Sequence, residues 1–290
     1  MQILLENESL LIQFSSKGAE LTSIKSQIDG VEYLWKADPN IWGRHAPLLF
    51  PIVGRLKENQ YQYKGDTYGM NQHGFVRDQD FQVIQQTPQS IWFELNANDF
   101  TLAQYPFHFR LRVGYELEEA TLRVVYEVAN LGNGLMPFSI GAHPGFSCPM
   151  VAGEVLEDYV IEFDQEEQAD THLLNDKGLF DGRTRPCLAG NRRIPITSTL
   201  FLDDALVFHH LNSSSAKLLS LRSGRYVEVS IKGFPFLGIW AKPGAPYVCI
   251  EPWHGLADLA ETSGDIFEKK GIYTLNANRT FSCDYTISCR

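Results

Sequence analysis

Basic residues are in deficit in this chain of 290 residues. It carries 25 Lys and Arg against 35 Asp and Glu, a formal net charge of −10 at pH 7. Nucleic-acid binding needs clustered Lys and Arg against the phosphates, so we expect no nucleic-acid partner. No apolar run approaches the roughly 18 residues of a membrane-spanning helix, and residues 1–14 lack the basic start and the cleavage site of a secretory signal. We therefore expect a cytoplasmic protein without a membrane partner.

Several catalytic motifs are also missing. The chain has no G-x-S-x-G elbow, no P-loop and no G-x-G-x-x-G. Neither H-x-H nor H-E-x-x-H occurs, so the spacing predicts no metal site. The five cysteines include no C-x-x-C pair, and we expect free thiols. Cys249 shares a strand face with Glu251, but a thiol nucleophile needs a base within reach, and the sequence shows none.

Helical periodicity is scarce, whereas period-2 alternation recurs along the chain. Residues 107–117, FHFRLRVGYEL, alternate apolar and polar side chains, and 122–128 do so again after a polar turn, which predicts a hairpin of long strands. Short helices are expected only near 38–43 and 264–271, and an irregular surface excursion over 164–190. The sequence therefore predicts an all-β sandwich or barrel that forms a single domain over residues 1–290.

Ionisable residues stand in four unusual settings. His143 lies between glycines in GAHPGF, and His73 precedes a glycine in NQHGFVRD. Glu251 ends the apolar run PYVCI, where a buried carboxylate is costly unless it is paired. Burial would raise its pKa towards the range of a useful general base. The alternatives are hydrogen-bonded structural histidines, a structural ion pair at Glu251, and a turn cap for Asp204 in FLDDALVF.

Taken together, NQHGFVRD, GAHPGF, DDALVF and IEPWHG, with the preceding RHAPLLFPIVGR, resemble the aldose 1-epimerase (galactose mutarotase-like) superfamily. The resemblance covers nearly the whole chain and is nearest to the LacX-type branch and the related hexose-6-phosphate epimerases. It implies a β-supersandwich with few short helices and a site in an open groove on the concave face. It also implies an isomerase of carbohydrate metabolism that needs no metal or organic cofactor.

The same resemblance implies roles for the four residues. His143 is expected to be the general acid and Glu251 the general base. His73 would assist at the ring oxygen or at a hydroxyl, and Asp204 would hold sugar hydroxyls. The expected partner is a small sugar, and the expected assembly is a monomer or homodimer.

The substrate depends on the arginines. Arg77 resembles an arginine that binds phosphate in hexose-6-phosphate epimerases, and Arg44 and Arg55 would add to a basic rim. The stretch GRHAPLLFP departs from the Arg-Gly-Gly run of the phosphate-using relatives, which favours a free aldose. Arg77 would then pair with a nearby aspartate or hydrogen-bond a hydroxyl. His254, close after Glu251, is expected to line the groove.

Two rival functions remain open at this stage. The first is a non-catalytic carbohydrate-binding protein on the same fold, because fold does not fix function. The second is a glycoside hydrolase or lyase, which would need Asp204 and Glu251 to flank the scissile bond at about 5–10 Å.

Overall fold

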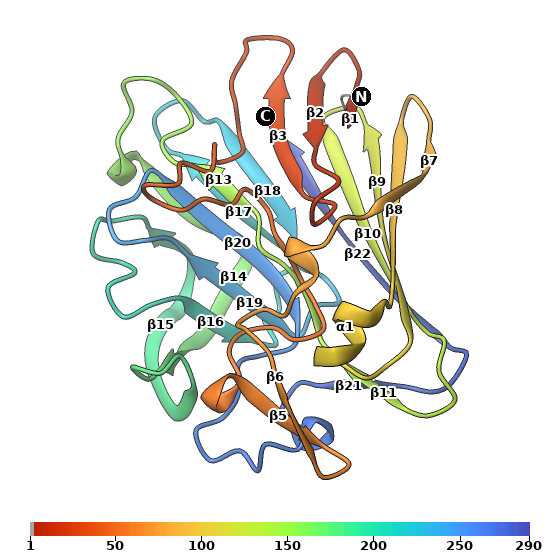
Figure 1. Cartoon of the computed structure of the whole chain (residues 1–290). Helices are drawn as coiled ribbons and strands as arrows, with labels where there is room; N and C mark the ends of the chain where they lie inside the picture. Colours follow the sequence, from red (N-terminus) through yellow and green to blue (C-terminus); the bar gives the residue numbers. More distant parts are fainter. Residues whose placement is uncertain (1–2) are drawn as a thin grey trace.

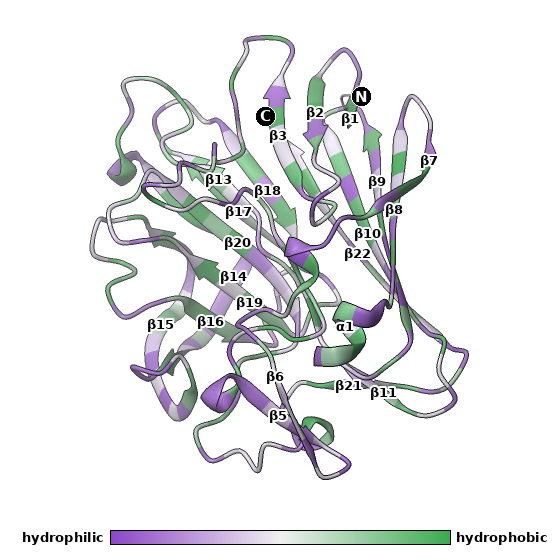
Figure 2. Cartoon of the chain, viewed as in Figure 1, coloured by the Kyte–Doolittle hydropathy of each residue, from purple (hydrophilic) through white to green (hydrophobic). Residues whose placement is uncertain are grey.

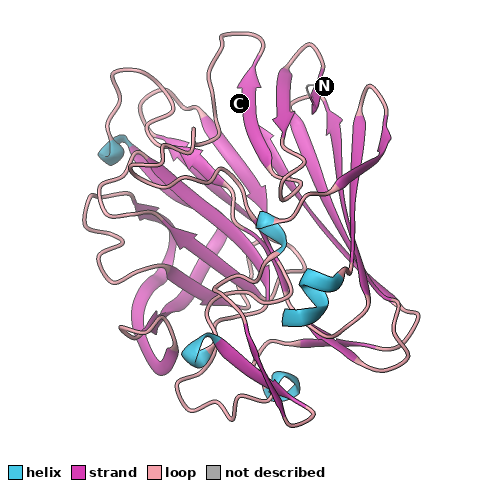
Figure 3. Ribbon diagram, in the orientation of Figure 1, coloured by secondary structure: helices cyan, strands magenta, loops and turns pink. Residues whose placement is uncertain are grey.

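The computed structural model describes residues 3–290 and is built mainly of β strands (Figure 1, Figure 3). The largest sheet has nine strands, in the spatial order β15 (Phe180–Pro195), β14 (Tyr159–Leu174), β17 (Ser215–Ser220), β18 (Tyr226–Ser230), β22 (Thr280–Cys289), β10 (Thr121–Asn130), β9 (Phe109–Glu118), β8 (Ser90–Asn96) and β7 (Gln82–Gln86). The all-β prediction is confirmed.

A six-stranded sheet carries the candidate residues. Its order is β16 (Leu206–His209), β19 (Phe236–Trp240), β20 (Tyr247–His254), β12 (Ile140–Ala142) and β4 (Leu48–Leu49), and β13 (Gly145–Ser147) also pairs with β20. Every residue of β20 is buried. Figure 1 shows β20, in blue, crossing the middle of the molecule beside β19.

Smaller elements complete the structure. A three-stranded sheet contains β1 (Ile3–Glu6), β2 (Leu10–Phe14) and β3 (Leu21–Ser26), and two-stranded ribbons join β5 (Gln60–Tyr63) to β6 (Asp66–Gly69) and β11 (Met136–Phe138) to β21 (Tyr273–Leu275). The helices are α1 (Asp99–Gln104) and the 3₁₀ turns η1 (Lys57–Asn59), η2 (Val76–Asp78), η3 (Leu156–Asp158) and η4 (Ile266–Glu268). Among residues 3–290 no helix has the length and apolar character needed to cross a membrane.

Alternation produced the predicted hairpin. β9 and β10 pair antiparallel from Thr121 opposite Glu118 to Asn130 opposite Phe109. Phe109, Leu111 and Val113 point from β9 into the main core, and the polar residues between them are partly exposed. The apolar bands along these strands are visible in Figure 2.

The expectation for residues 164–190 was wrong. Instead of an irregular excursion, these residues belong largely to β14 and β15, which form an antiparallel hairpin with several register shifts. In the outer part of the hairpin, most of β15 is exposed, and the buried positions of β14 are the polar residues Glu167 and Thr171, so apolar alternation is lacking. Figure 2 shows β15 mostly purple and white, whereas part of β20 is green.

The helix predictions were also partly wrong. Residues 38–43 contain a turn and no helix, and 264–271 contain only the single turn η4. The helix α1 was not predicted. It is short, and its first turn is closed by a capping box in which the Asn98 side chain accepts from the Thr101 N–H and the Thr101 side chain accepts from the Asn98 N–H.

Candidate active site

A cavity of about 860 Å³ opens beside the six-stranded sheet. Its lining includes most of the predicted site residues: His73, His143, Asp204, Glu251, Arg55 and Arg77. It also includes Trp253, which was expected to line the groove because it follows Glu251 closely, and Trp42, Trp240, Arg183 and Arg185, which sequence analysis had not assigned to a site.

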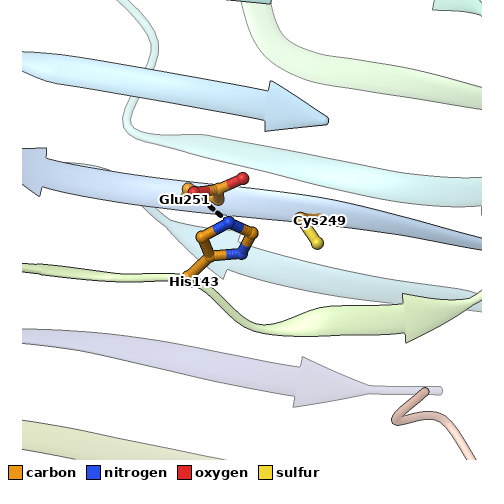
Figure 4. A group of neighbouring side chains, drawn as sticks. All are labelled: His143, Cys249 and Glu251. Atoms are coloured by element: carbon orange, nitrogen blue, oxygen red, sulfur yellow. Dashed lines mark ion pairs between the residues drawn. The ribbon is translucent and has the colours of Figure 1, made fainter. Parts of the chain in front are cut away.

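His143 and Glu251 face each other on the floor of this cavity. β12 pairs with β20 through Gly141 opposite Trp253, and β13 resumes the same register with Gly145 opposite Cys249. The loop between these two pairs therefore holds His143 opposite Glu251. The His143 Nε2 atom lies 3.3 Å from the Glu251 Oε2 atom (Figure 4).

Burial governs the charge of this pair. Glu251 is 1 % exposed and His143 is 8 % exposed. Loss of hydration raises the pKa of Glu251 well above its usual range; the carboxylate of Asp204 adds to the rise, and the indole N–H of Trp253 opposes it. Burial likewise lowers the pKa of His143 to about 3. The Glu251 Oε2 and His143 Nδ1 atoms have no hydrogen-bond partner among the described residues.

Two indoles hold the His143 ring in place. Trp42 stacks on it at 5.0 Å between ring centroids, and Trp240 meets it edge-on at 5.7 Å. The glycines of GAHPGF make room for indoles: a Cβ on Gly145 would come within 2.8 Å of the Trp42 ring, and one on Gly141 within 2.6 Å of the Trp253 ring. A run with glycines on both sides of a histidine was the only sequence signal for this packing.

His73 joins the site through a strained turn. Its φ is +67°, and a Cβ on the following Gly74 would lie 2.1 Å from the Phe50 carbonyl oxygen, so only glycine fits there. The His73 ring lies 5.5 Å from the His143 ring. Burial and the neighbouring cationic groups lower the pKa of His73 well below its usual range. Its Nδ1 accepts a hydrogen bond from the Gly54 N–H at 3.1 Å, and its Nε2 lies 3.2 Å from the side-chain nitrogen of Gln72.

The three predicted arginines lie on one side of the site. Arg77 lines the cavity and donates from Nη2 to the Gln72 carbonyl at 2.7 Å, and Arg55 lines it beside the Gln72 side chain. The Nε atoms of both are buried and have no hydrogen-bond partner among residues 3–290. Arg44 does not line this cavity; it pairs with Asp78 at 3.1 Å and lines a neighbouring cavity of about 450 Å³ together with Arg55 and Arg77. Burial and the charge of Arg44 lower the pKa of Arg77 to about 10.

Asp204 combines the two roles considered for it. It lines the cavity, and its Oδ1 accepts from the Ala205 N–H at 2.8 Å, as a turn cap does. Its backbone has a φ of +74° and its side chain is exposed.

The prediction that His254 lines the groove was wrong. Successive residues of β20 point to opposite faces, so Glu251 and Trp253 face the cavity while His254 faces the interior. There its Nδ1 lies 2.9 Å from the Tyr273 hydroxyl, and its ring packs against Phe234 and Phe281.

The fold and the site together define a class: an all-β protein with a buried carboxyl–imidazole pair open to a polar cavity. Comparison with known proteins gives the family. The chain belongs to the aldose 1-epimerase family, whose model matches residues 1–274.

Its relatives agree with this membership. The plasmid and chromosomal LacX proteins of Lactococcus lactis are each 38 % identical over 279 residues, which is 93 % of this chain and 93 % of theirs. A crystal structure of a galactose mutarotase related enzyme from Lactobacillus acidophilus matches with a TM-score of 0.95 at 38 % identity, over 100 % of this chain and 97 % of that one. A galactose mutarotase-like protein from Lactobacillus casei matches with a TM-score of 0.94 at 31 % identity, over 100 % of both chains. The fold is therefore the galactose mutarotase-like β-sandwich.

Proposed function

We propose that this protein is an aldose 1-epimerase that interconverts the α and β anomers of a hexose, with Glu251 as the general base and His143 as the general acid. The observation that carries the proposal is the 3.3 Å contact between His143 Nε2 and Glu251 Oε2 on the floor of a cavity of about 860 Å³. One acid and one base side by side are what ring opening and closure require.

The reaction needs no net change in protonation. The Glu251 carboxylate takes the proton of the anomeric hydroxyl O1 while protonated His143 gives a proton to the ring oxygen O5. The C1–O5 bond breaks and C1=O1 forms. Rotation about C1–C2 presents the other carbonyl face, and the reverse proton transfers close the ring as the other anomer.

The acid and the base of this proposal are both charged: protonated His143 and the Glu251 carboxylate. Burial disfavours both charged forms, so sugar hydroxyls have to replace the lost water around them. Trp42 supports protonated His143 because an indole face stabilises a stacked cation. His73, which lines the same cavity, would assist at the ring oxygen or at a hydroxyl.

A free aldose is the substrate we propose, and a hexose 6-phosphate is the second candidate. The buried, unpartnered Nε atoms of Arg55 and Arg77 in the cavity wall favour the second. The pairing of Arg44 with Asp78, outside the cavity, favours the first because it leaves fewer free cations. The imidazole of His143 at 3.3 Å from Glu251 favours an acid–base epimerase, whereas the hydrolase alternative would pair Glu251 with Asp204, which lines the same cavity.

We also propose a cytoplasmic location, and this proposal rests on the cysteines. All five cysteines are free, which suits a reducing cytoplasm. The partner we propose is the sugar alone, bound by a monomer or homodimer.

Anomer interconversion itself tests the function. Freshly dissolved α-glucose, α-galactose and glucose 6-phosphate are each followed to equilibrium by polarimetry or NMR exchange, with wild type and His143→Ala. We expect the wild type to accelerate the approach to equilibrium for at least one sugar and the variant to lose that acceleration. Sugar binding without any acceleration would replace the proposal with a non-catalytic sugar-binding protein.

A further inference from the structure

A thiol completes a three-residue cluster at the acid–base pair. Cys249 and Glu251 are two residues apart on β20, and Gly145 pairs with Cys249 just after His143. One donor atom from each of His143, Cys249 and Glu251 lies within 4.8 Å of the other two. Figure 4 shows the sulfur and the carboxyl group on either side of the imidazole ring. All three residues are buried, and the Glu251 Oε2 atom has no hydrogen-bond partner in the described chain.

We propose that His143, Cys249 and Glu251 form a binding site for Zn²⁺ or a similar thiophilic divalent ion, and that an ion bound there inhibits the protein. Imidazole nitrogen, thiolate sulfur and carboxylate oxygen are the donors that Zn²⁺ takes in proteins. Bonds of roughly 2.0–2.3 Å around a tetrahedral ion separate its ligands by about 3.3–3.8 Å. Donors that lie within 4.8 Å of one another therefore need to close by about 1.5 Å at most, which side-chain rotation supplies.

The charges of a divalent ion and these three ligands cancel, which suits a buried site. A thiolate and a carboxylate carry two negative charges, and a neutral imidazole adds none, so the complex with a divalent ion is uncharged. The thiolate is the form of cysteine that binds a metal, so binding of M²⁺ displaces the proton of the Cys249 thiol.

An ion can reach these residues from the cavity, and once bound it would block the acid–base pair. His143 and Glu251 line the cavity, so an ion can arrive from that side and keep a fourth position open to water or sugar. A metal bond occupies the lone pairs that ring opening would use. The inhibition rests on the proposed function; the binding of the ion does not.

Spectroscopy with Co²⁺ tests the site directly. The whole protein, reduced and free of metal, is titrated with Co²⁺ and then with Zn²⁺. We expect one Co²⁺ per chain with a thiolate-to-cobalt charge-transfer band, which Zn²⁺ abolishes. Loss of one of three ligands in Cys249→Ala should remove the band and weaken Zn²⁺ binding about 100-fold. Cys289→Ala, a buried thiol on β22 in the other sheet, is the matched control and should leave both unchanged.

The wild type provides a second measurement that does not depend on a variant folding. Calorimetry in buffers of different ionisation enthalpy should show proton release on Zn²⁺ binding, and the affinity should rise with pH, because the Cys249 thiol loses its proton to the ion. A Co²⁺ complex without the charge-transfer band, no proton release, or an equal loss in Cys289→Ala would each overturn the proposal.

Activity separates the two proposals. Zn²⁺ should slow anomer interconversion in wild type, and the ratio of rates with and without Zn²⁺ should return towards one in Cys249→Ala. If the band forms but no sugar is interconverted, the metal site stands and the proposed function fails. If sugar is interconverted and Zn²⁺ changes neither the rate nor the Co²⁺ spectrum, the proposed function stands and the metal site fails.

Discussion

The floor and the outer wall of the cavity belong to one site but have opposite environments. On the floor, the side chains of His143 and Glu251 are 10 % and 2 % exposed. On the wall, those of Arg183 and Asp203 are 60 % and 66 % exposed. A charge is costly on the floor and costs little on the wall. Under the proposed function, proton transfer would therefore depend on the buried side chains of the floor, and substrate recognition on the exposed charges of the wall. Substitutions in the two regions should then affect different kinetic parameters.

The largest effect should come from the floor. Glu251→Gln removes the base and keeps the shape, so kcat should fall by about 10²–10⁴-fold with little change in sugar affinity. NMR exchange gives kcat and ligand titration gives affinity. Glu154→Gln is the matched control, because Glu154 is also buried but hydrogen-bonds Tyr159 and Ser220 away from the cavity. An equal loss of kcat in both variants would contradict the role of Glu251.

The same substitution should reveal the cost of burying the carboxyl. Because the folded pKa of Glu251 is raised, the folded state keeps a proton that the unfolded state loses as the pH rises above 4.5, the ordinary pKa of a glutamate side chain. Wild-type stability therefore decreases with rising pH, by up to about 1.4 kcal/mol per unit from this group. Urea unfolding between pH 5 and 7 should show Glu251→Gln gaining on wild type as the pH rises. A constant gap would mean that the carboxyl is not buried as described.

A smaller effect is expected from the indole on His143. Trp42→Leu removes the stacked ring, and the loss of about 0.5–1.5 kcal/mol should lower kcat by about 2–10-fold. Steady-state rates measure the change. Trp92→Leu, on β8 of the other sheet, is the matched control and should keep the wild-type rate. Identical rates in the two variants would remove Trp42 from the acid's environment.

Substitutions on the cavity wall should change KM and leave kcat unchanged. Arg183→Ala should raise KM by roughly 3–10-fold and leave kcat unchanged, since an exposed side chain contributes to binding and not to proton transfer. Arg193→Ala is matched to it: Arg193 is on the same strand and 53 % exposed, but it pairs with Glu162 and does not line the cavity. A fall in kcat for Arg183→Ala would mean that wall and floor are not separable.

The smallest effect on activity is expected at His254. His254→Gln should keep kcat within about 2-fold, because the ring faces away from the cavity. The stability of the wild-type protein should change with pH because of this histidine. Burial lowers the folded pKa of His254 from 6.5 to about 4, so below pH 6.5 only the unfolded state gains the proton, and stability is lost as the pH falls through this range. Thermal unfolding at pH 7, 6 and 5 should show a shallower decline in the variant. Loss of activity at pH 7 would restore His254 to the site.

Local sequence was sufficient where one face of an element is buried. Alternation along 107–117 predicted the β9–β10 hairpin because a half-buried strand repeats every two residues. It failed over 164–190, where most of β15 is exposed and the buried positions of β14 are the polar residues Glu167 and Thr171, so no apolar alternation marks the strands. The arginines of this hairpin were missed with it.

By itself, the sequence determined that the chain is all-β, and its ionisable residues beside glycines, His73 and His143, marked where to look for chemistry. Only the tertiary structure decided that His143 lies 3.3 Å from Glu251, that Cys249 joins them, that Arg44 pairs with Asp78, and that His254 faces the interior. The physical reason is the distance along the chain between the residues that interact. Side-chain alternation is set within a strand, whereas contacts between strands far apart in the chain depend on register and on the packing of two sheets, which no local pattern records.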